Sequence, residues 1–508
     1  MTNNYYITTP IYYVNDAPHI GHAYTTIACD VIARFQRLNG KNVLFLTGTD
    51  EHGQKVQKSA LKNHLSEQEF VDQMSNKFID LTRKLNISND DFIRTTQLRH
   101  KKTVEVLWNK LLEKKYIYLG EYEGWYSVRD EAFYDKSELT QDGLAPTGAP
   151  VEWVKEQSYF FALSKFQEPL LELYKKNPSF VNPESKYNEV VSFVKGGLLD
   201  LSISRTSFNW GISVPNDSKH VVYVWLDALT NYISALDYEQ NAEKYHKFWP
   251  ANAHIVGKDI LRFHAVYWPA FLMAAGIELP KSIFAHGWWT NEGQKISKSI
   301  GNVIDPFELV DEFGLDAVRY FLMREITFGN DGNYARSSLI NRNNTELANK
   351  IGNLMNRTFV LLFKNNGGFV PNLDSKEVEK IYQLPLLQMA NKLALDICSL
   401  MDNFKISIAL EKVIKLAEQA NVYIDIEEPW KLSKTDKHSM FNVLYNLLET
   451  MRYIGIIMQA FIPHSAKIIL DQLSIPCDQR LLQHLSMDYA IAPNLKLQEP
   501  MLIFNKLE

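Results

Sequence analysis

Two histidines near the start of the chain stand where they could bind phosphate. His19 and His22 flank Gly21 in a Pro-His-Ile-Gly-His run, and apolar residues at helical spacing begin directly afterwards. A helix N-terminus carries partial positive charge and free N–H groups, both of which favour phosphate oxygens. The two imidazoles would lie on one face of the first turn, and Gly21 would leave room for a base or a sugar. The alternative interpretation is a pair of half-buried histidines at a helix start.

A second run concentrates positive charge much later in the chain. The segment Lys295–Ser299 reads Lys-Ile-Ser-Lys-Ser and lies between Gly293 and Gly301. Two lysines on flexible stems could stabilise the charge that develops on a triphosphate when an acyl group attacks its α-phosphorus. The alternative interpretation is a solvated basic turn.

The residues around the histidines predict a strand–helix–strand unit. Residues 5–9 form a β-prone run, apolar residues recur at helical spacing from Ile20 to Leu38, and 42–46 form a second strand. We expect Asn15, Asp16 and Pro18 to supply the helix-start chemistry, and Gly40 to end the helix. Such a unit is typical of a parallel crossover, whose ligands bind at the carboxyl ends of the strands.

The rest of the chain changes character twice. Residues 116–215 are rich in Tyr, Trp, Glu and short turns, whereas short apolar runs return at 221–225, 253–257 and 283–287. Helical periodicity dominates from about residue 335. We therefore predict an α/β protein with a Rossmann-type doubly wound parallel sheet (1–115 and 216–334), an inserted connective module (116–215) and an α-helical domain (335–508).

Composition excludes several classes of protein. The 508 residues carry a net charge of −5, with 46% hydrophobic and 22% charged residues, which is ordinary for a globular protein. Three cysteines are too few and too scattered for a disulfide framework. No apolar run approaches the roughly 20 residues of a membrane span, and the N-terminus lacks a signal or transit pattern. We expect a cytoplasmic protein with no membrane association.

Taken together, the His-Ile-Gly-His and Lys-Ile-Ser-Lys-Ser runs resemble the paired signatures of the class I aminoacyl-tRNA synthetases. Within that class the chain resembles the methionyl-tRNA synthetases, and the matches extend from residue 5 to about residue 430. The further runs that carry this resemblance are Thr8–Asn15, Thr47–Gly53, Tyr223–Ala228, His254–Ile260 and Phe263–Pro269.

The resemblance implies a ligase that acts in two steps. Methionine and ATP, the latter with Mg²⁺ held mainly by its phosphates, would give methionyl-adenylate, and the methionyl group would then pass to the terminal adenosine of methionine tRNAs, initiator and elongator. Positioning and electrostatics would supply the catalysis. The implied catalytic residues are His19, His22, Lys295 and Lys298; the implied ATP-binding residues are Gly21, Gly257, Asp259, Ser297 and Lys298.

A methionine pocket needs a carboxylate for the ammonium group and polarizable walls for the thioether. Asp50, after the second strand, is the natural ammonium partner, with the Ile11 carbonyl beside it. A Tyr or His donor that reaches the sulfur would add discrimination against aliphatic isosteres. The residues that match the family's side-chain pocket are Tyr13, Trp225, Tyr232, His264 and Trp268. Core packing is the alternative for the tryptophans, and a buried ion pair is the alternative for Asp259.

The helical domain matches the family's anticodon-binding region. Leu347, Ile351, Leu354, Thr358 and Leu362 form an apolar stripe, which leaves the opposite face of the helix to solvent. RNA loops are bound by stacking on aromatic rings and by amide or guanidinium bonds to base edges. The implied anticodon residues are Asn353, Arg357 and Trp430; the alternative is a solvated face and a core tryptophan.

The chain also departs from many of its relatives. The inserted module lacks the Cys-x-x-Cys pairs that bind zinc in other members, so we expect no structural zinc. The insert is shorter than the editing domains of the valine, isoleucine and leucine enzymes. Little sequence follows the helical domain, which favours a monomer over a chain with an added dimerisation domain.

Two other functions remain in contention. Nucleotidylyltransferases share the His-x-Gly-His run and would adenylylate a small substrate without tRNA, although the long helical domain disfavours them. A non-catalytic tRNA-binding relative is the other possibility, although it would have no use for the two motifs.

Overall fold

Seven strands build one parallel sheet in the computed structural model of the chain, which describes residues 3–127, 132–134, 136–296 and 301–508. Their order is β2-β3-β1-β13-β14-β8, with β4 along the other edge of β3. Every pairing in this sheet is parallel. The strands are β1 (Asn4–Thr8), β2 (Tyr12–Tyr13), β3 (Asn42–Asp50), β4 (Asp91–Arg94), β8 (Val181–Asn182), β13 (Ala253–Gly257) and β14 (Ile283–His286).

Helices cover both faces of this sheet because its side chains alternate between two apolar clusters. Ile7 and Phe45 pack with α1 and α11, whereas Tyr6 and Leu44 pack with α4, α7 and α9. The predicted doubly wound α/β architecture is therefore confirmed. The helices of this part are α1 (Ile20–Leu38), α2 (Gln54–Lys62), α3 (Glu67–Lys84), α4 (Leu98–Glu113), α5 (Gln167–Lys176), α6 (Glu184–Lys195), α7 (Val224–Ser234), α8 (Ala242–Phe248), α9 (Trp268–Ala275), α10 (Pro306–Phe313) and α11 (Leu315–Arg324).

The first strand–helix–strand unit follows the sequence closely, apart from the helix cap. Helix α1 has the predicted bounds, and β3 extends four residues beyond the predicted strand to include Asp50. The prediction that Asn15, Asp16 and Pro18 start the helix is wrong, because the N-cap is His19. Its ring can accept a backbone N–H in the way that the usual Asn and Asp caps do.

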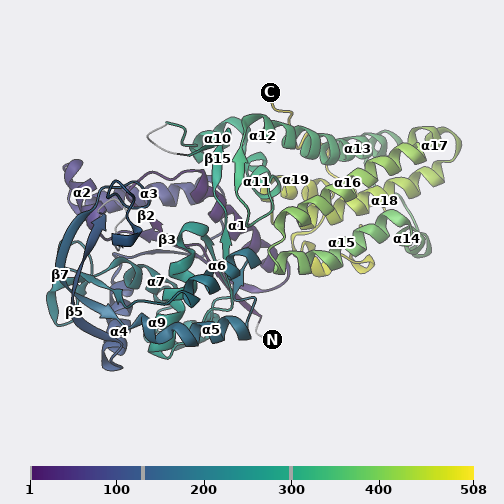
Figure 1. Ribbon diagram of the computed structural model, residues 1–508. Coiled ribbons are helices and arrows are strands. Elements are labelled where there is room, and N and C mark those ends of the chain that lie inside the picture. The colour runs from purple at the N-terminus through teal and green to yellow at the C-terminus, as the bar shows by residue number, and fades with distance from the viewer. Residues whose placement is uncertain (1–2, 128–131, 135, 297–300) are drawn as a thin grey trace.

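The interval 116–215 contributes strands to three different sheets. Strands β5 and β7 form a long antiparallel ribbon that projects from the end of the molecule opposite the helical bundle (Figure 1). By contrast, β8 and α6 return to the parallel sheet, where β8 pairs with β14. The antiparallel elements are β5 (Ile117–Ser127), β6 (Ala132–Tyr134), β7 (Glu152–Phe161) and β9 (Leu201–Ser202), followed by β10 (Ser204–Arg205), β11 (Ser213–Val214) and β12 (Asp217–Val222).

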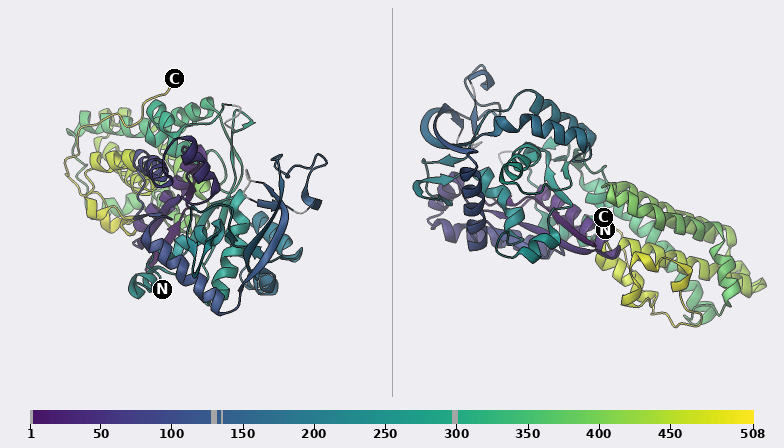
Figure 2. Two further views of the ribbon diagram at one scale, coloured as in Figure 1. Left: turned by 90° about the vertical axis from the view of Figure 1, so that its left-hand side faces the viewer. Right: turned by 90° about the horizontal axis from the view of Figure 1, so that it is seen from below.

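From residue 335 onward the described elements are helices, which form an elongated bundle on one side of the sheet (Figures 1 and 2). A π-helical stretch, Asn343–Gly352, joins α12 to α13 without a break. In the part of the chain that the structure describes, no helix is both long and apolar enough to cross a membrane. The bundle helices are α12 (Arg336–Arg342), α13 (Asn353–Asn366), α14 (Ser375–Tyr382), α15 (Pro385–Asp402), α16 (Ile406–Glu427), α17 (Pro429–Thr435), α18 (Lys437–Met458) and α19 (Pro463–Gln472).

A fully buried arginine joins the sheet domain to the bundle. The Arg319 guanidinium on α11 donates to the Asp30 carboxylate on α1 at 2.7 Å and to the Leu85 carbonyl at 3.1 Å. Its Nε donates to the carbonyl of Phe461, just before α19, at 2.9 Å. Both charged side chains have no exposed surface, so Arg319 depends on Asp30 for compensation, and Asp30 also accepts from Arg34 at 2.7 Å.

We predict that Arg319→Ala destabilises the protein strongly. The variant leaves the buried Asp30 carboxylate paired with the partly exposed Arg34, and loss of a buried partner costs up to about 3–5 kcal/mol of folding free energy. Thermal unfolding should show a clear fall in the midpoint. The matched control is Arg83→Ala, which removes the exposed pair with Asp80 and should change stability by about 0.5 kcal/mol or less. Equal midpoints for the two variants would contradict this role for Arg319.

Candidate active site

The two histidines of the first motif are held by the backbone of the turn that they begin. His19 Nδ1 accepts the Gly21 N–H at 3.0 Å, and His22 Nδ1 accepts the His19 N–H at 3.1 Å, in a reciprocal cap. A Cβ on Gly21 would lie 2.9 Å from the His19 ring, so the glycine is required by this cap. The predicted free space at Gly21 is thus occupied, at least in part, by the ring of His19.

These hydrogen bonds determine which ring nitrogens face a ligand. Burial lowers the pKa of His19, against a smaller raising effect of Asp259. Burial and the neighbouring His19 lower the pKa of His22 well below its usual value. Because each neutral ring uses Nδ1 as an acceptor, its proton lies on Nε2. Both histidines therefore offer neutral N–H donors at neutral pH, and neither brings a positive charge.

The chain just after the second motif contacts the first motif. The Ile20 N–H, in the first turn of α1, donates to the Ile304 carbonyl at 3.1 Å, a few residues beyond the lysine-rich run. Lys295 is exposed at the end of β16 (Gln294–Lys295), which pairs with β15 (Trp289–Asn291); β15 also pairs with β17 (Gly332–Tyr334). Ser297 and Lys298 lie outside the described residues.

Asp259 and Gly257 stand at the carboxyl end of β13, as predicted. The Asp259 carboxylate is exposed and accepts the indole N–H of Trp288 at 3.0 Å, so it is not a buried ion pair. A Cβ on Gly257 would lie 2.5 Å from the Asp259 carboxylate, so a larger residue there would displace that side chain from its present position. The Lys258 and Lys295 ammonium groups lie 4.5 and 5.7 Å from the centre of the Trp288 ring. The Trp288 side chain thus lies beside one carboxylate and two ammonium groups, a position that the sequence did not suggest.

The predicted ammonium partner lies at the end of a central strand. Asp50 is the last residue of β3 and is 7% exposed. Tyr13 of β2 is its partner in the parallel register, and the partly buried Ile11 comes directly before β2. The structure therefore brings Ile11, Tyr13 and Asp50 to one place at the sheet edge.

Four aromatic side chains of the predicted pocket come from α7, from the π-helical turn Phe263–Tyr267 and from the first residue of α9. Tyr232 Oη lies 2.7 Å from His264 Nε2, and His264 Nδ1 lies 2.9 Å from the Ile260 carbonyl oxygen. A carbonyl only accepts, so Nδ1 donates, and burial lowers the pKa of His264 to about 4. Tyr232 therefore donates to His264, and the donors expected for a thioether sulfur are engaged by protein acceptors. Trp268 is fully buried, 6.0 Å from the ring of Tyr232.

Trp225 differs from Trp268 because it is only partly buried. Its ring stacks on Phe263, with centroids 3.4 Å apart and an angle of 15° between the planes. Phe263 and His264 begin a π-helical turn (Phe263–Tyr267), a local widening of the helix that is frequent at functional sites. The sequence run that contains Phe263 is apolar and gave no sign of this stacking.

The predicted anticodon residues lie together on the bundle, far along the chain from the sheet edge. Asn353 is exposed on α13, and the Arg357 guanidinium lies 5.7 Å from the centre of the Trp430 ring on α17. Trp430 is 38% exposed, so it is not a core residue. Arg357 also pairs with Asp425 at 2.5 Å. The predicted apolar stripe from Leu347 to Leu362 is buried.

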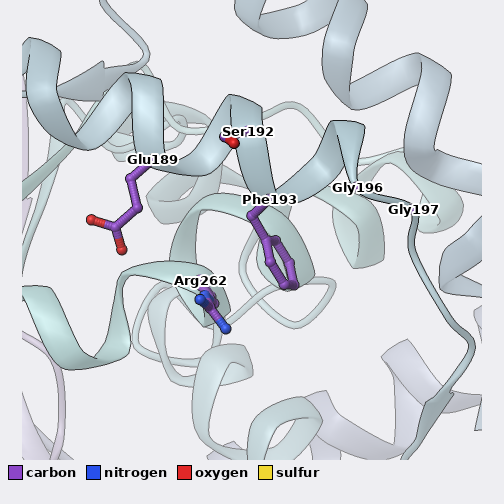
Figure 3. Close-up of a pocket in the computed structure, with 6 residues that line it drawn as sticks. All are labelled: Glu189, Ser192, Phe193, Gly196, Gly197 and Arg262. Carbon is purple, nitrogen blue, oxygen red and sulfur yellow. The ribbon is translucent and has the colours of Figure 1, made fainter. Parts of the chain in front are cut away.

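No group of three or more His, Cys, Asp or Glu side chains in the described ranges is arranged to hold a metal ion. A surface hollow of about 480 Å³ lies beside α6, where Arg262 lies 4.4 Å from the ring of Phe193 (Figure 3). Its lining includes none of the predicted site residues. The candidate site is therefore the polar edge of the sheet, and this hollow is separate from it.

Comparisons with known proteins agree with this geometry. A family model described as tRNA synthetases class I (M) matches residues 5–147 and 145–359. A methionine–tRNA ligase of Rickettsia conorii is 63% identical over all 508 residues of both chains, and one of Brucella suis is 52% identical over 94% of this chain and 93% of its own.

Two solved structures from Mycobacterium tuberculosis have the same fold. Methionyl-tRNA synthetase in complex with methionyl-adenylate has a TM-score of 0.94 and 45% identity, and covers 99% of this chain and 100% of its own. The free form has a TM-score of 0.89 and 42% identity, and the match covers 100% of this chain and 99% of that one. With a family match over most of the chain and such identity over its full length, this chain belongs to the methionyl-tRNA synthetases, a family of the class I aminoacyl-tRNA synthetases.

Proposed function

We propose that the carboxyl edge of the sheet is where this chain carries out the reaction of its family. Methionine and ATP form methionyl-adenylate there, and the methionyl group then passes to the 3′-terminal adenosine of methionine tRNA. The observation that carries this proposal is the hydrogen bond from the Ile20 N–H, in the first turn of α1, to the carbonyl of Ile304, just after the lysine-rich run. The names of the relatives and the adenylate in one solved relative support it.

In this proposal neutral histidine donors and lysine charges act together on the phosphates. His19 and His22 donate from Nε2 to phosphate oxygens at a helix start that already favours anions. Lys295 and Lys298 supply the positive charge that follows the departing pyrophosphate. Mg²⁺ arrives with ATP and is held mainly by the phosphates, as part of the substrate.

The remaining ATP contacts come from the loop after β13 and from the two motifs. The Asp259 carboxylate accepts hydrogen bonds from the ribose hydroxyls. The lack of a side chain at Gly257 leaves room for this carboxylate beside the backbone. Gly21 keeps the His19 cap in place, and Ser297 donates to the phosphates. The exposed position of the Asp259 carboxylate supports the ribose role, because a group in contact with substrate must be accessible.

Methionine would lie between Asp50 and the aromatic residues of α7 and α9. Asp50 binds the ammonium group, with help from the Ile11 carbonyl. Tyr13, Trp225, Tyr232, His264 and Trp268 form walls that suit a polarizable thioether. The neutral state of His264 supports this assignment, since burying a charged imidazole against a thioether would be unfavourable.

The bundle, 335–508, would bind the anticodon of methionine tRNAs, initiator and elongator. Asn353 and Arg357 would bond base edges, and Trp430 would stack on a base; its exposed ring supports that role. We further propose a cytoplasmic monomer that contains no structural zinc.

One pair of assays tests the function as a whole. Methionine-dependent exchange of pyrophosphate into ATP reports the first step, and charging of methionine tRNA reports the second. Both should proceed. Exchange with a different small acid and no charging would indicate a nucleotidylyltransferase, and tRNA binding without either activity would indicate a non-catalytic relative.

We predict that Lys298→Ala slows adenylate formation by orders of magnitude. The lost charge stabilises the transition state more than bound substrate, so kcat should fall while the Michaelis constant for methionine changes little. Pyrophosphate exchange measures both quantities. The control is Lys281→Ala, which removes an exposed lysine just before β14 and should leave exchange unchanged. A normal rate for Lys298→Ala would refute its assignment.

We predict that Trp430→Ala separates the two steps. Stacking of a base on an aromatic ring contributes about 1–3 kcal/mol, so charging efficiency should fall by roughly tenfold or more. Discrimination against altered anticodons should weaken, while pyrophosphate exchange stays near wild type.

The matched control for Trp430 is Leu395→Ala, another exposed apolar residue of the bundle that should affect neither assay. Thermal unfolding should be unchanged in both variants. A general loss of stability and of both activities in Trp430→Ala would show that the residue is structural.

A further inference from the structure

Three buried polar side chains near the candidate site have no role in the steps above. Asp227, on α7, has 1% of its side chain exposed; His52 follows β3, and His100 lies in the first turn of α4. The two histidine side chains are 5% and 0% exposed. Buried groups of this kind are costly unless they are fully paired, so their arrangement needs an explanation.

The two imidazole rings contact the same carboxylate, one ring at each oxygen. His52 Nδ1 lies 2.6 Å from Asp227 Oδ2, and His100 Nε2 lies 2.7 Å from Asp227 Oδ1. Each carboxylate oxygen thus has its own ring. We call these three residues the Asp227 clamp.

The clamp has a defined hydrogen-bond direction. Burial alone would raise the pKa of Asp227, but charge and hydrogen bonds from His52 and His100 outweigh burial and hold that pKa well below its usual value. Asp227 is therefore a carboxylate, which can only accept, and both histidines donate. Charge-assisted bonds of this length are among the stronger ones in proteins.

The clamp joins the two halves of the proposed methionine pocket. His52 lies two residues after Asp50, and Asp227 lies two residues after Trp225 in the first turn of α7. Between Asp50 and His52, the buried Glu51 is fixed separately by Arg94 at 2.6 Å and Thr96 at 2.5 Å. The segment after β3 is thus anchored to the sheet by Glu51 and to α7 by His52.

We propose that Asp227 is a positioning residue for methionine: through His52 and His100 it fixes the spacing between the carboxylate that binds the ammonium group and the aromatic wall that faces the thioether. One methionine must reach both ends at once, so this spacing selects the length of the amino acid. The inference rests on the proposed function, because it assumes that Asp50 and Trp225 bind methionine.

Paired variants of His100 test the clamp with little change in volume. His100→Leu removes the donor, whereas His100→Gln can place an amide N–H where the ring Nε2–H was. His52 offers a second pair, His52→Leu and His52→Asn, whose amide can replace Nδ1–H. Kinetics of pyrophosphate exchange with methionine, with ethionine (one methylene longer) and with ATP are compared across the four variants.

Each leucine variant should raise the Michaelis constant for methionine by about tenfold, the usual effect of leaving a buried partner unpaired. The Michaelis constant for ATP should change by about twofold or less, because the clamp does not touch the ATP side. The ratio of kcat/KM for methionine over ethionine should fall, since a loosened pocket admits the extra methylene. The amide variants should restore the ratio.

The outcomes separate this inference from the proposed function. Michaelis constants and the methionine-to-ethionine ratio do not depend on how much enzyme is folded, so a partly destabilised variant still gives an answer. The positioning role of Asp227 would be contradicted by a wild-type methionine-to-ethionine ratio in both leucine variants. It would also be contradicted if the leucine and amide variants lost this selectivity to the same extent. Asp50→Asn is the reference: if it leaves the methionine constant unchanged, the proposed role of Asp50 fails, and the inference falls with it.

Discussion

All strands of the central sheet run in one direction, and the site depends on that constraint. Parallel strands bring their carboxyl ends to a single edge, so β1, β3, β13 and β14, which are widely separated in sequence, deliver their following loops to the same place. Asp50 ends β3, and His19, Asp259 and Trp288 follow β1, β13 and β14. Because the sheet is covered on both faces, the edge is also where polar side chains can be placed without crossing an apolar core.

At this edge, neutral hydrogen-bond donors and positive charges belong to different residues. Desolvation lowers the pKa of the partly buried histidines, and fixed backbone partners orient their rings, so they can serve as neutral, directional donors. In the proposed reaction, positive charge would come instead from an exposed lysine such as Lys295, whose ammonium group lies 5.7 Å from the centre of the Trp288 ring. A preorganised donor set needs little rearrangement during the reaction, whereas the charge can follow a phosphate that moves.

Sequence patterns predicted the elements well and the side-chain contacts less well. Helical spacing located α1, and short β-prone runs located β1 and β3, because burial of these segments shapes the sequence directly. The cap of α1 was misassigned to Asn15 and Asp16, since a histidine in that role has no strong sequence preference. The partners of Asp227 lie 127 and 175 residues away along the chain, so only the folded structure could reveal them.

The return of part of the insert to the main sheet was missed for a similar reason. Strand β8 has two residues, too few for a period, and its place beside β14 is set by tertiary packing. Trp288 gave no signal because an exposed tryptophan after a strand resembles any loop residue. By contrast, Asp50 and Asp259 could be assigned from position alone, because each follows a clear apolar strand.

The π-helical stretch between α12 and α13 affects how this chain can vary in length. Its turns hold more residues than α-helical turns, so it can lose a residue and still remain helical. Loss of one residue within Asn343–Gly352 can be absorbed by tightening toward an α-helix, which leaves the direction of Asn353 and Arg357 intact. Loss of one residue inside α13 would instead rotate every later side chain by about 100° around the axis. The π-helical stretch directly precedes α13, so a residue lost there would leave the exposed face of α13 pointing in the same direction.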